Sequence, residues 1–242
     1  MVIHVINFIP RISTDSVKVG VIVFPGSNCD RDMYHVLTDV FDLDTQYFWH
    51  EKHLPKNIDA VVLPGGFSYG DRLRAGIIAA HSPIISDVKK LAEKGIPILG
   101  VCNGFQILVE SGLLPGVLLK NDSLNFMCEW TNLIVKNNMT PFTNKLELNQ
   151  KIPIPIANGE GRYFVDKQMI KKLAKKNQIV FSYENYVNGS MEQIAGVCNE
   201  DGNVVGMMPH PERAVEKEIN PNDNKPSTLI FESLIQSIGA KN

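Results

Sequence analysis

Residues 96–106, Ile-Pro-Ile-Leu-Gly-Val-Cys-Asn-Gly-Phe-Gln, carry the pattern from which the fold can be inferred. An apolar run ends at Val101 and a helical pattern starts at Phe105, so we expect a strand, a sharp turn and a helix. Cys102 stands at the apex with a glycine two residues to either side, which is the G-x-C-x-G form of a nucleophile elbow. The glycines let the strand and helix backbones pass close together, and the helix N-terminus favours thiolate over thiol.

The same five residues also fit a buried structural cysteine beside a tight turn, because most free cysteines behave as small hydrophobic residues. The pentapeptide alone favours neither the catalytic nor the structural interpretation. The rest of the chain has to decide between them.

Length and composition describe an ordinary soluble globular chain. Its 242 residues are 44% hydrophobic and 21% charged, and its net charge is −2. This length and hydrophobic content suffice for a full hydrophobic core. We see no basic stripe for nucleic acid, and the apolar residues 1–10 are too short to span a membrane. The four cysteines lack zinc-site spacing, so we expect no metal, free thiols and a reducing, cytoplasmic location.

Short apolar runs alternate with helical patterns as far as the elbow. Strands are expected at 19–24, 46–49, 60–63 and 96–101, and helices at 30–40 and 77–91, the second broken near Pro83. This alternation predicts an α/β fold, doubly wound, with a mainly parallel sheet and helices on both faces. Functional groups gather at the carboxyl ends of such strands, so the glycine-rich turns there should share one rim.

The second half of the chain changes to short strands separated by turn signals. They are expected at 133–135, 152–156, 163–165, 179–183, 194–198 and 204–208. We predict an antiparallel excursion attached to the main sheet, with a small helix at 168–175 and a final helix between Ser227 and Gly239. Since no repeat or linker is visible, we predict a single domain over residues 18–242, preceded by an N-terminal extension, residues 1–17, of unknown role.

A cysteine nucleophile needs a base and a group that orients the base. Pro209-His210-Pro211-Glu212 offers both, directly after a predicted strand. Residues two apart in an extended chain project to the same side, so Glu212 should fix the tautomer of His210 while His210 faces the sulfur. A histidine between prolines can also be a rigid turn residue, but together with the elbow the triad is the better interpretation.

An acyl-transfer site also needs donors for the oxygen of its tetrahedral intermediate, each worth roughly 3 kcal/mol. One donor would be the backbone N–H of Asn103, the residue after the nucleophile. The other would come from the turn at Gly65-Gly66, where missing side chains let the backbone approach a substrate. Paired glycines also occur in plain turns, so this feature supports the hypothesis without proving it.

Three strings in this order, LPGG at 63–66, GVCNGFQ at 100–106 and PHPE at 209–212, resemble those of the class I (triad) glutamine amidotransferases. Longer strings resemble the glutaminase subunits of phosphoribosylformylglycinamidine synthases. These strings are VFPGSNCDRD at 23–32, LPGGFSYGDRLRAG at 63–76, NGSMEQIAG at 188–196 and GMMPHPERA at 206–214. The resemblance covers residues 18 to about 239 and leaves residues 1–17 without a counterpart.

The resemblance implies a role for each matching residue. Cys102 would attack L-glutamine, release ammonia and form a γ-glutamyl thioester, which water then cleaves to glutamate. His210 would act as general base and then acid, with Glu212 as its partner. The residues implied for the oxyanion and for glutamine binding are Gly65, Gly66, Asn103 and Gln106. One departure is Asn158, where the resemblance leads us to expect histidine.

The chain has no P-loop and no dinucleotide-binding fingerprint, so we expect no cofactor in it. The resemblance implies a large synthetase subunit, which would use ATP and Mg to amidate formylglycinamide ribonucleotide in de novo purine biosynthesis. It also implies a small accessory subunit, and low glutaminase activity of the free chain. Charged residues that flank the site loops, and that we consider as rim residues, are Asp71, Arg72, Arg74 and Arg213.

Two other functions remain in competition. A cysteine hydrolase or peptidase-like enzyme on the same fold would keep the elbow but need not have PHPE after a late strand. A non-catalytic binding subunit with a vestigial elbow predicts a substitution at Cys102, His210 or Glu212, and all three are intact. An amidotransferase of another pathway belongs to the first hypothesis, that of a glutamine amidotransferase, and the longer strings argue against this other pathway.

Overall fold

The computed structural model describes residues 17–221 and 226–239. The predicted extension, residues 1–17, therefore lies outside the described residues except for Val17, whose side chain is buried. Its separation from a single domain over residues 18–242 stays a prediction. Within the described part, no helix combines the length and the apolar character needed to cross a membrane.

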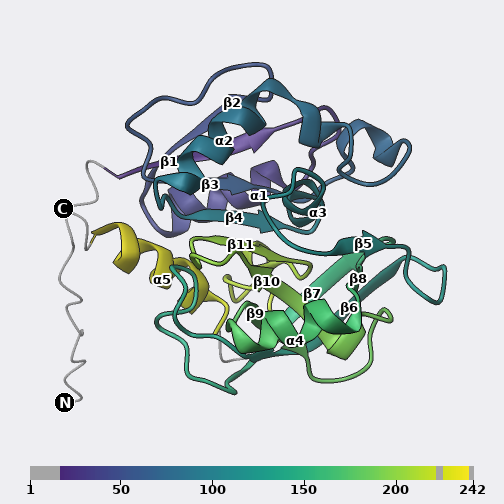
Figure 1. Cartoon of the computed structure of the whole chain (residues 1–242). Coiled ribbons are helices and arrows are strands. Elements are labelled where there is room, and N and C mark those ends of the chain that lie inside the picture. Colours follow the sequence, from purple (N-terminus) through teal and green to yellow (C-terminus); the bar gives the residue numbers. More distant parts are fainter. Residues whose placement is uncertain (1–16, 222–225, 240–242) are drawn as a thin grey trace, which may run out of the picture.

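One mixed sheet runs through the described chain (Figure 1). Its strands are β1 (Lys18–Val23), β2 (Asp44–Trp49), β3 (Ala60–Leu63), β4 (Ile98–Val101), β6 (Met127–Val135), β7 (Lys151–Asn158), β9 (Ile179–Tyr183), β10 (Ile194–Cys198) and β11 (Val204–Met207). Their order in space is β2-β1-β3-β4-β11-β10-β9-β6-β7. The strands from β2 to β11 in this order run parallel, and the strands from β10 to β7 are antiparallel to their neighbours.

This order confirms the predicted mainly parallel sheet with an antiparallel excursion. The predicted strand at 204–208 is the junction of the two halves, because β11 pairs antiparallel with β10 and parallel with β4. The turn around Asp201 and Gly202 reverses the chain after β10 and so brings β11 into the parallel direction. The residue after β11 therefore lies at the same sheet edge as the elbow after β4.

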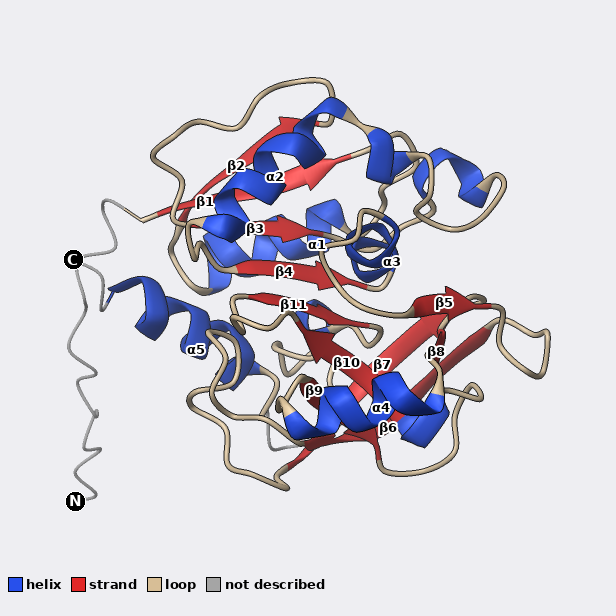
Figure 2. Ribbon diagram, viewed as in Figure 1, coloured by secondary structure: helices blue, strands red, loops and turns tan. Residues whose placement is uncertain are grey.

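Helices cover both faces of the parallel half, as predicted (Figure 2). The described α-helices are α1 (Asp30–His35), α2 (Pro83–Glu93), α3 (Asn103–Glu110), α4 (Lys167–Lys175) and α5 (Thr228–Gly239). In the view of Figures 1 and 2, α2 lies in front of the sheet and α1 behind it. The break expected near Pro83 is present, since a short 3₁₀ turn at Ala79–His81 precedes α2.

The predicted strand near Tyr163 is not part of the main sheet. It appears as β8 (Arg162–Phe164), which pairs with β5 (Val117–Leu119) in a separate two-stranded sheet. Tyr163 anchors this sheet, because its buried ring stacks on Phe105 and its hydroxyl donates to the carbonyl of Pro115 at 2.8 Å. The small sheet is thereby attached to the helix after the elbow.

The centre of the parallel half is tightly packed where β3, β4 and α3 meet. Every residue of β3 and β4 is buried, as expected for strands covered on both faces. A Cβ atom added at Gly104 would lie only 1.9 Å from the carbonyl oxygen of Leu63. The first turn of α3 can therefore approach β3 only because residue 104 is glycine.

This contact leads to a prediction about stability. Gly104→Ala should lower the free energy of unfolding by about 3 kcal/mol, because the backbone of β3 has to move to admit the methyl group. Alanine has the better helix propensity, by about 1 kcal/mol, so propensity alone predicts the opposite sign. Urea unfolding of the two proteins measures the difference.

Gly159→Ala is the matched control, since a Cβ there would meet only Phe126, at 3.6 Å. We expect it to change stability by less than about 0.5 kcal/mol. If Gly104→Ala were as stable as this control, the close packing of α3 against β3 would be contradicted.

Candidate active site

Cys102 occupies the turn between β4 and α3 in a conformation that few residues adopt. Its φ is 50° and its ψ −107°, and its backbone N–H donates to the carbonyl of Met207 at 2.8 Å. Such a backbone conformation costs on the order of 1–3 kcal/mol in a residue other than glycine, and the surrounding structure has to maintain it. The sharp strand–turn–helix predicted from G-x-C-x-G is therefore present, with Cys102 at the carboxyl edge of the sheet.

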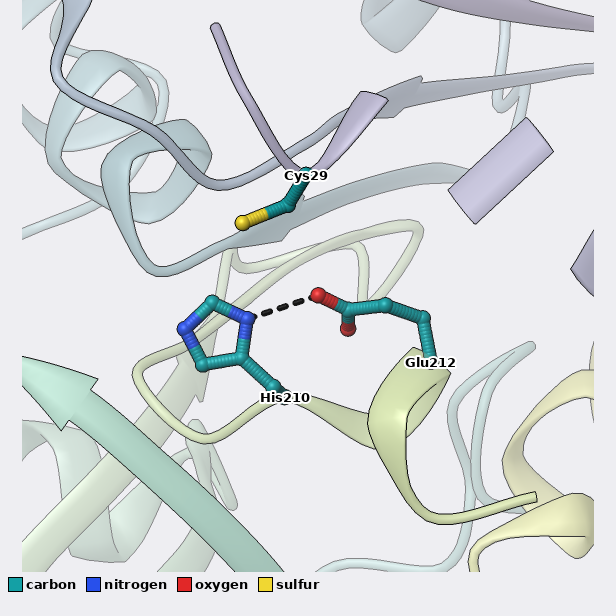
Figure 3. A group of neighbouring side chains, drawn as sticks. All are labelled: Cys29, His210 and Glu212. Carbon is teal, nitrogen blue, oxygen red and sulfur yellow. Dashed lines mark hydrogen bonds and ion pairs between the residues drawn. The ribbon is translucent and has the colours of Figure 1, made fainter. Parts of the chain in front are cut away.

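His210 and Glu212 form a buried pair immediately after β11. The Nδ1–H of His210 donates to Oε1 of Glu212 at 2.6 Å, and both side chains are buried (Figure 3). The backbone N–H of His210 donates to the carbonyl of Pro155 at 2.9 Å, which ties this segment to β7. The hydrogen bond to Glu212 fixes the orientation of the ring, with Nε2 directed away from the carboxylate.

Gly65, just after β3, lies next to both His210 and Cys102. A Cβ atom added there would lie 2.8 Å from Cε1 of His210 and 3.4 Å from Cβ of Cys102. The imidazole and the cysteine therefore flank the same glycine, although they come from segments more than a hundred residues apart. Only a residue without a side chain fits between them.

The surroundings of His210 determine its protonation. Burial is the largest single effect and disfavours the charged imidazole. The neighbouring Glu212, and to a smaller extent Cys102 and Cys29, together outweigh burial and raise the pKa of His210 well above its ordinary value. The direction of this shift favours the protonated imidazole. A group in this state can donate a proton to a leaving group and take one back.

A second cysteine lies beside the pair, and the sequence did not point to it. The Sγ of Cys29 is next to the His210 ring (Figure 3), and Nη2 of Arg213 donates to this sulfur at 3.1 Å. Burial raises the pKa of the Cys29 thiol. In the sequence, Cys29 and His210 belong to two of the longer strings that carry the family resemblance, SNCDRD at 27–32 and PHPERA at 209–214. Membership of these strings does not indicate that the two residues are in contact.

Cys29, His210 and Glu212 are also the group in the described part of the chain that could hold a metal ion. Their ligand atoms lie within 4.8 Å of one another. The guanidinium of Arg213 is directed at the Cys29 sulfur, however, and a positive charge there opposes the binding of a cation. We therefore interpret the group as part of a proton-transfer site. All four cysteines of the chain are free thiols.

A pocket of about 260 Å³ opens next to Cys102. Its wall combines the elbow, the loops after β3 and β5, and the end of β7. The lining residues are Gly66, Phe67, Asp71, Cys102, Gln106, Lys120, Leu124, Phe126, Ala157, Asn158, Gly159 and Glu160. The volume lies just below the range of about 300–1,000 Å³ that is usual for drug-sized ligands, so the pocket suits a small metabolite.

The other residues predicted for the site fall into two groups. Gly66 and Gln106 line the pocket, whereas the side chain of Asn103 is buried and supports its wall. Asn103 accepts from Ser68 N–H at 3.1 Å and donates to Gln106 at 2.8 Å, and Gln106 donates to the carbonyl of Glu160 at 2.7 Å. As the first residue of α3, Asn103 has a backbone N–H without an acceptor inside the helix.

The residues considered for the rim of the site differ in their position relative to the pocket. Asp71 lines the pocket, and Arg213 contacts Cys29 and Asp32. Arg74 pairs instead with Glu110 on α3, away from the pocket wall. Asn158, the departure noted in the sequence, lines the pocket with a buried side-chain amide that makes no hydrogen bond to the described residues.

The environment of Asp71 predicts a pH-dependent cost in stability. Burial, and secondly the charge of Glu160, raise the pKa of Asp71 from 3.8 to about 6. The folded state therefore binds this proton more tightly than the unfolded state, and stability falls as the pH rises from about 4 to about 6. We expect Asp71→Asn to raise the free energy of unfolding by about 1 kcal/mol at neutral pH, less than the full shift because Asp71 is partly solvated.

Urea unfolding at neutral pH and below about pH 4 measures this effect, and the gain should vanish in acid because Asp71 is then protonated in both states. Asp201→Asn, in an exposed turn, is the matched control. An Asp71→Asn protein that is less stable than the wild type at both pH values would contradict the prediction.

Comparison with known proteins relates this geometry to a family. The sequence matches the profile of the CobB/CobQ-like glutamine amidotransferase domain over residues 16–236. It is 48% identical, over 232 residues, to the phosphoribosylformylglycinamidine synthase subunit PurQ of Salinibacter ruber. The aligned region covers 92% of this chain and 97% of that protein.

Solved structures give the same result. A chain in the structure of PurLQS from Thermotoga maritima superposes with a TM-score of 0.83 at 47% identity, covering 92% of this chain and 99% of that chain. The glutaminase domain of Trypanosoma brucei CTPS superposes with a TM-score of 0.58 at 16% identity, covering 93% and 94% of the two chains. The second match is similarity of fold alone.

Proposed function

Since this chain belongs to the family of CobB/CobQ-like glutamine amidotransferase domains, we propose that it hydrolyses L-glutamine as the glutaminase subunit of a phosphoribosylformylglycinamidine synthase. The predicted resemblance to the class I glutamine amidotransferases is confirmed by the family match and by the 48% identity to a PurQ subunit. The observation that carries the chemistry is the meeting of Cys102 with the His210–Glu212 pair around Gly65, beside a small pocket.

In the proposed first half-reaction, Cys102 attacks the side-chain amide carbon of glutamine as the thiolate, its proton being the one that the imidazole of His210 carries. A C–S bond forms, and the amide oxygen takes up the negative charge. His210 then gives its proton to the amide nitrogen, so that the C–N bond breaks and ammonia leaves. Glu212 keeps the ring oriented and compensates the positive charge of the imidazolium.

In the second half-reaction, water attacks the γ-glutamyl thioester while His210 takes up a proton from it. The C–S bond breaks, glutamate leaves, and Cys102 and His210 return to their starting states. In both halves the oxyanion would be stabilised by backbone N–H groups of Gly65 or Gly66 and of Asn103. These residues are suited to the role because Gly65 touches the base, Gly66 lines the pocket, and Asn103 begins α3.

We further propose that the ammonia is used by a partner. The relative from Salinibacter ruber is a synthase subunit, and the Thermotoga maritima structure is one of PurLQS. By analogy, a large synthetase subunit would bind ATP and Mg and amidate formylglycinamide ribonucleotide, and a small accessory subunit would complete the complex. A reducing cytoplasmic location suits a chain that works through a free cysteine.

The competing hypotheses have less support. A non-catalytic binding subunit would not need a strained cysteine beside a buried histidine–carboxylate pair, and such strain is typical of active sites. A cysteine hydrolase or peptidase-like enzyme could use the same triad. The family match over residues 16–236 favours an amidotransferase over such an enzyme.

The proposed function predicts one modified residue. A chloroketone analogue of glutamine should alkylate Cys102 alone, and an excess of glutamine should prevent the reaction, because the sulfur lies in the substrate pocket. Mass spectrometry of the digested protein locates the adduct. Cys102→Ser should abolish labelling, whereas Cys128→Ser, which removes an exposed cysteine outside the pocket lining, should leave it unchanged.

Labelling spread over Cys29, Cys128 and Cys198, or labelling that glutamine does not reduce, would contradict the proposal for the isolated chain. Repeating the experiment with the synthetase partner present then tests the complex. If labelling remained scattered there as well, the amidotransferase function would be wrong.

A further inference from the structure

The pocket beside Cys102 contains three charged side chains that the proposed mechanism does not use. Asp71 and Glu160 are acidic, and Lys120 is basic. The proposed substrate carries one α-ammonium group and one α-carboxylate group in addition to the amide that reacts. The acidic side chains of the pocket can therefore pair with the ammonium group of a free amino acid, and the basic side chain can pair with its carboxylate.

We propose that Asp71 and Glu160 bind the α-ammonium group of the substrate, that Lys120 binds its α-carboxylate, and that the site thereby selects a free amino acid rather than a simple amide. This inference rests on the proposed function and assigns the residues that select its substrate. A metal ion is a poorer fit than a zwitterion, because the positive Lys120 shares the wall of the pocket with the two carboxylates.

Asp71 is held in place by a strained loop. Tyr69, Asp71 and Leu73 have φ values of 55°, 51° and 69°, in the left-handed region that is unfavourable for side chains other than glycine. Hydrogen bonds fix both ends of the loop, from Ser68 N–H to Asn103 at 3.1 Å and from Ala75 N–H to Oε2 of Glu160 at 3.3 Å. Strain maintained in this way is typical of residues that have to be presented to a ligand.

The two carboxylates repel each other in the empty pocket. Oδ1 of Asp71 is buried and makes no hydrogen bond to the described residues. Burial and the neighbouring charge of Glu160 raise the pKa of Asp71 to about 6, which shows that the negative charge is poorly compensated. An ammonium group placed between the carboxylates would remove the repulsion and supply the missing hydrogen bond.

Asn158 is an independent indication that the pocket is built for a polar ligand. Its side chain is 3% exposed and lines the pocket, yet neither its amide oxygen nor its amide nitrogen has a hydrogen-bond partner among the described residues. Leaving such a buried amide unpaired costs the desolvation of its polar groups without return. The oxygen can accept from an ammonium group and the nitrogen can donate to a carboxylate, so one zwitterion can satisfy both.

A comparison of two substrates tests the subsite in the isolated full chain. L-glutamine carries the α-ammonium group, and glutaric acid monoamide has the same chain and amide without it. Ammonia release gives kcat and KM for both substrates with the wild type, Asp71→Asn and Glu160→Gln. Asp201→Asn, in an exposed turn outside the pocket, is the matched control and should behave as the wild type.

We expect Asp71→Asn to lower kcat/KM for L-glutamine about 10- to 100-fold, mainly through KM, because a charge-assisted hydrogen bond is lost. The same substitution should change kcat/KM for glutaric acid monoamide less than about 3-fold, because this substrate has no ammonium group to lose. Lys120→Met should weaken both substrates, since both carry the carboxylate. Glu160→Gln should behave as Asp71→Asn does.

Two results would overturn the subsite. One is an unchanged preference for L-glutamine in Asp71→Asn, and the other is an equal loss for both substrates, which would mean a structural role. Either result is distinct from a failure of the proposed function. If the wild type released no ammonia from L-glutamine in a Cys102-dependent reaction, even with the synthetase partner, the proposed function and the subsite would both be wrong.

Discussion

The close approach of α3 to β3 is the constraint on which the active site depends. At Gly104 the backbone of α3 leaves no room for a methyl group against Leu63, and at Gly65 the backbone leaves none against His210. These two contacts bring the elbow after β4 and the turn after β3 to the same point. With the elbow fixed there, Cys102 is forced to a φ of 50° and its thiol is presented at the edge of the sheet. The sharpness of the turn is thus a consequence of packing in the core.

The topology of the sheet brings in the base. β11 lies beside β4 and runs in the same direction, so the segment after β11 emerges next to the elbow. His210 and Glu212 come directly after β11 and are buried with a hydrogen bond of 2.6 Å between them. An ion pair buried in this way is costly unless its hydrogen bonds are made, and here Glu212, with Cys102 and Cys29 beside the ring, raises the pKa of His210. Fold and electrostatics therefore act on the same few atoms.

The sequence contained enough information to predict the parallel half of the fold and to propose the triad. Continuous apolar runs between helical patterns are specific to strands covered on both faces, and β3 was predicted with its actual bounds. Cys102, His210 and Glu212 could be found because their chemistry depends on short spacings within two local strings. Features that arise from contacts between distant segments, such as the pairing of β5 with β8, have no such local spacing and could not be predicted.

The same limit applies to the residues around the triad. Cys29 reaches His210 only because β1 lies beside β3, and Asp71 reaches the pocket only through a loop with several left-handed residues. Neither the position of a thiol relative to a distant histidine nor backbone strain has a signature in sequence spacing. Asn158 was noticed as a departure from a family pattern, but its significance comes from its burial without a hydrogen-bond partner among the described residues. Asp71 and Asn158 both line the pocket beside Cys102.

The central claim is that the buried pair holds a proton on His210 in the isolated chain, ready for transfer. Nitrogen-15 NMR of the His210 ring as a function of pH tests this claim most directly, with His210→Asn used to assign the signals. Our account predicts that both ring nitrogens remain protonated at neutral pH and that deprotonation occurs well above the ordinary value of about 6.5. A His210 ring that is neutral at pH about 7, with a transition near or below 6.5, would contradict it.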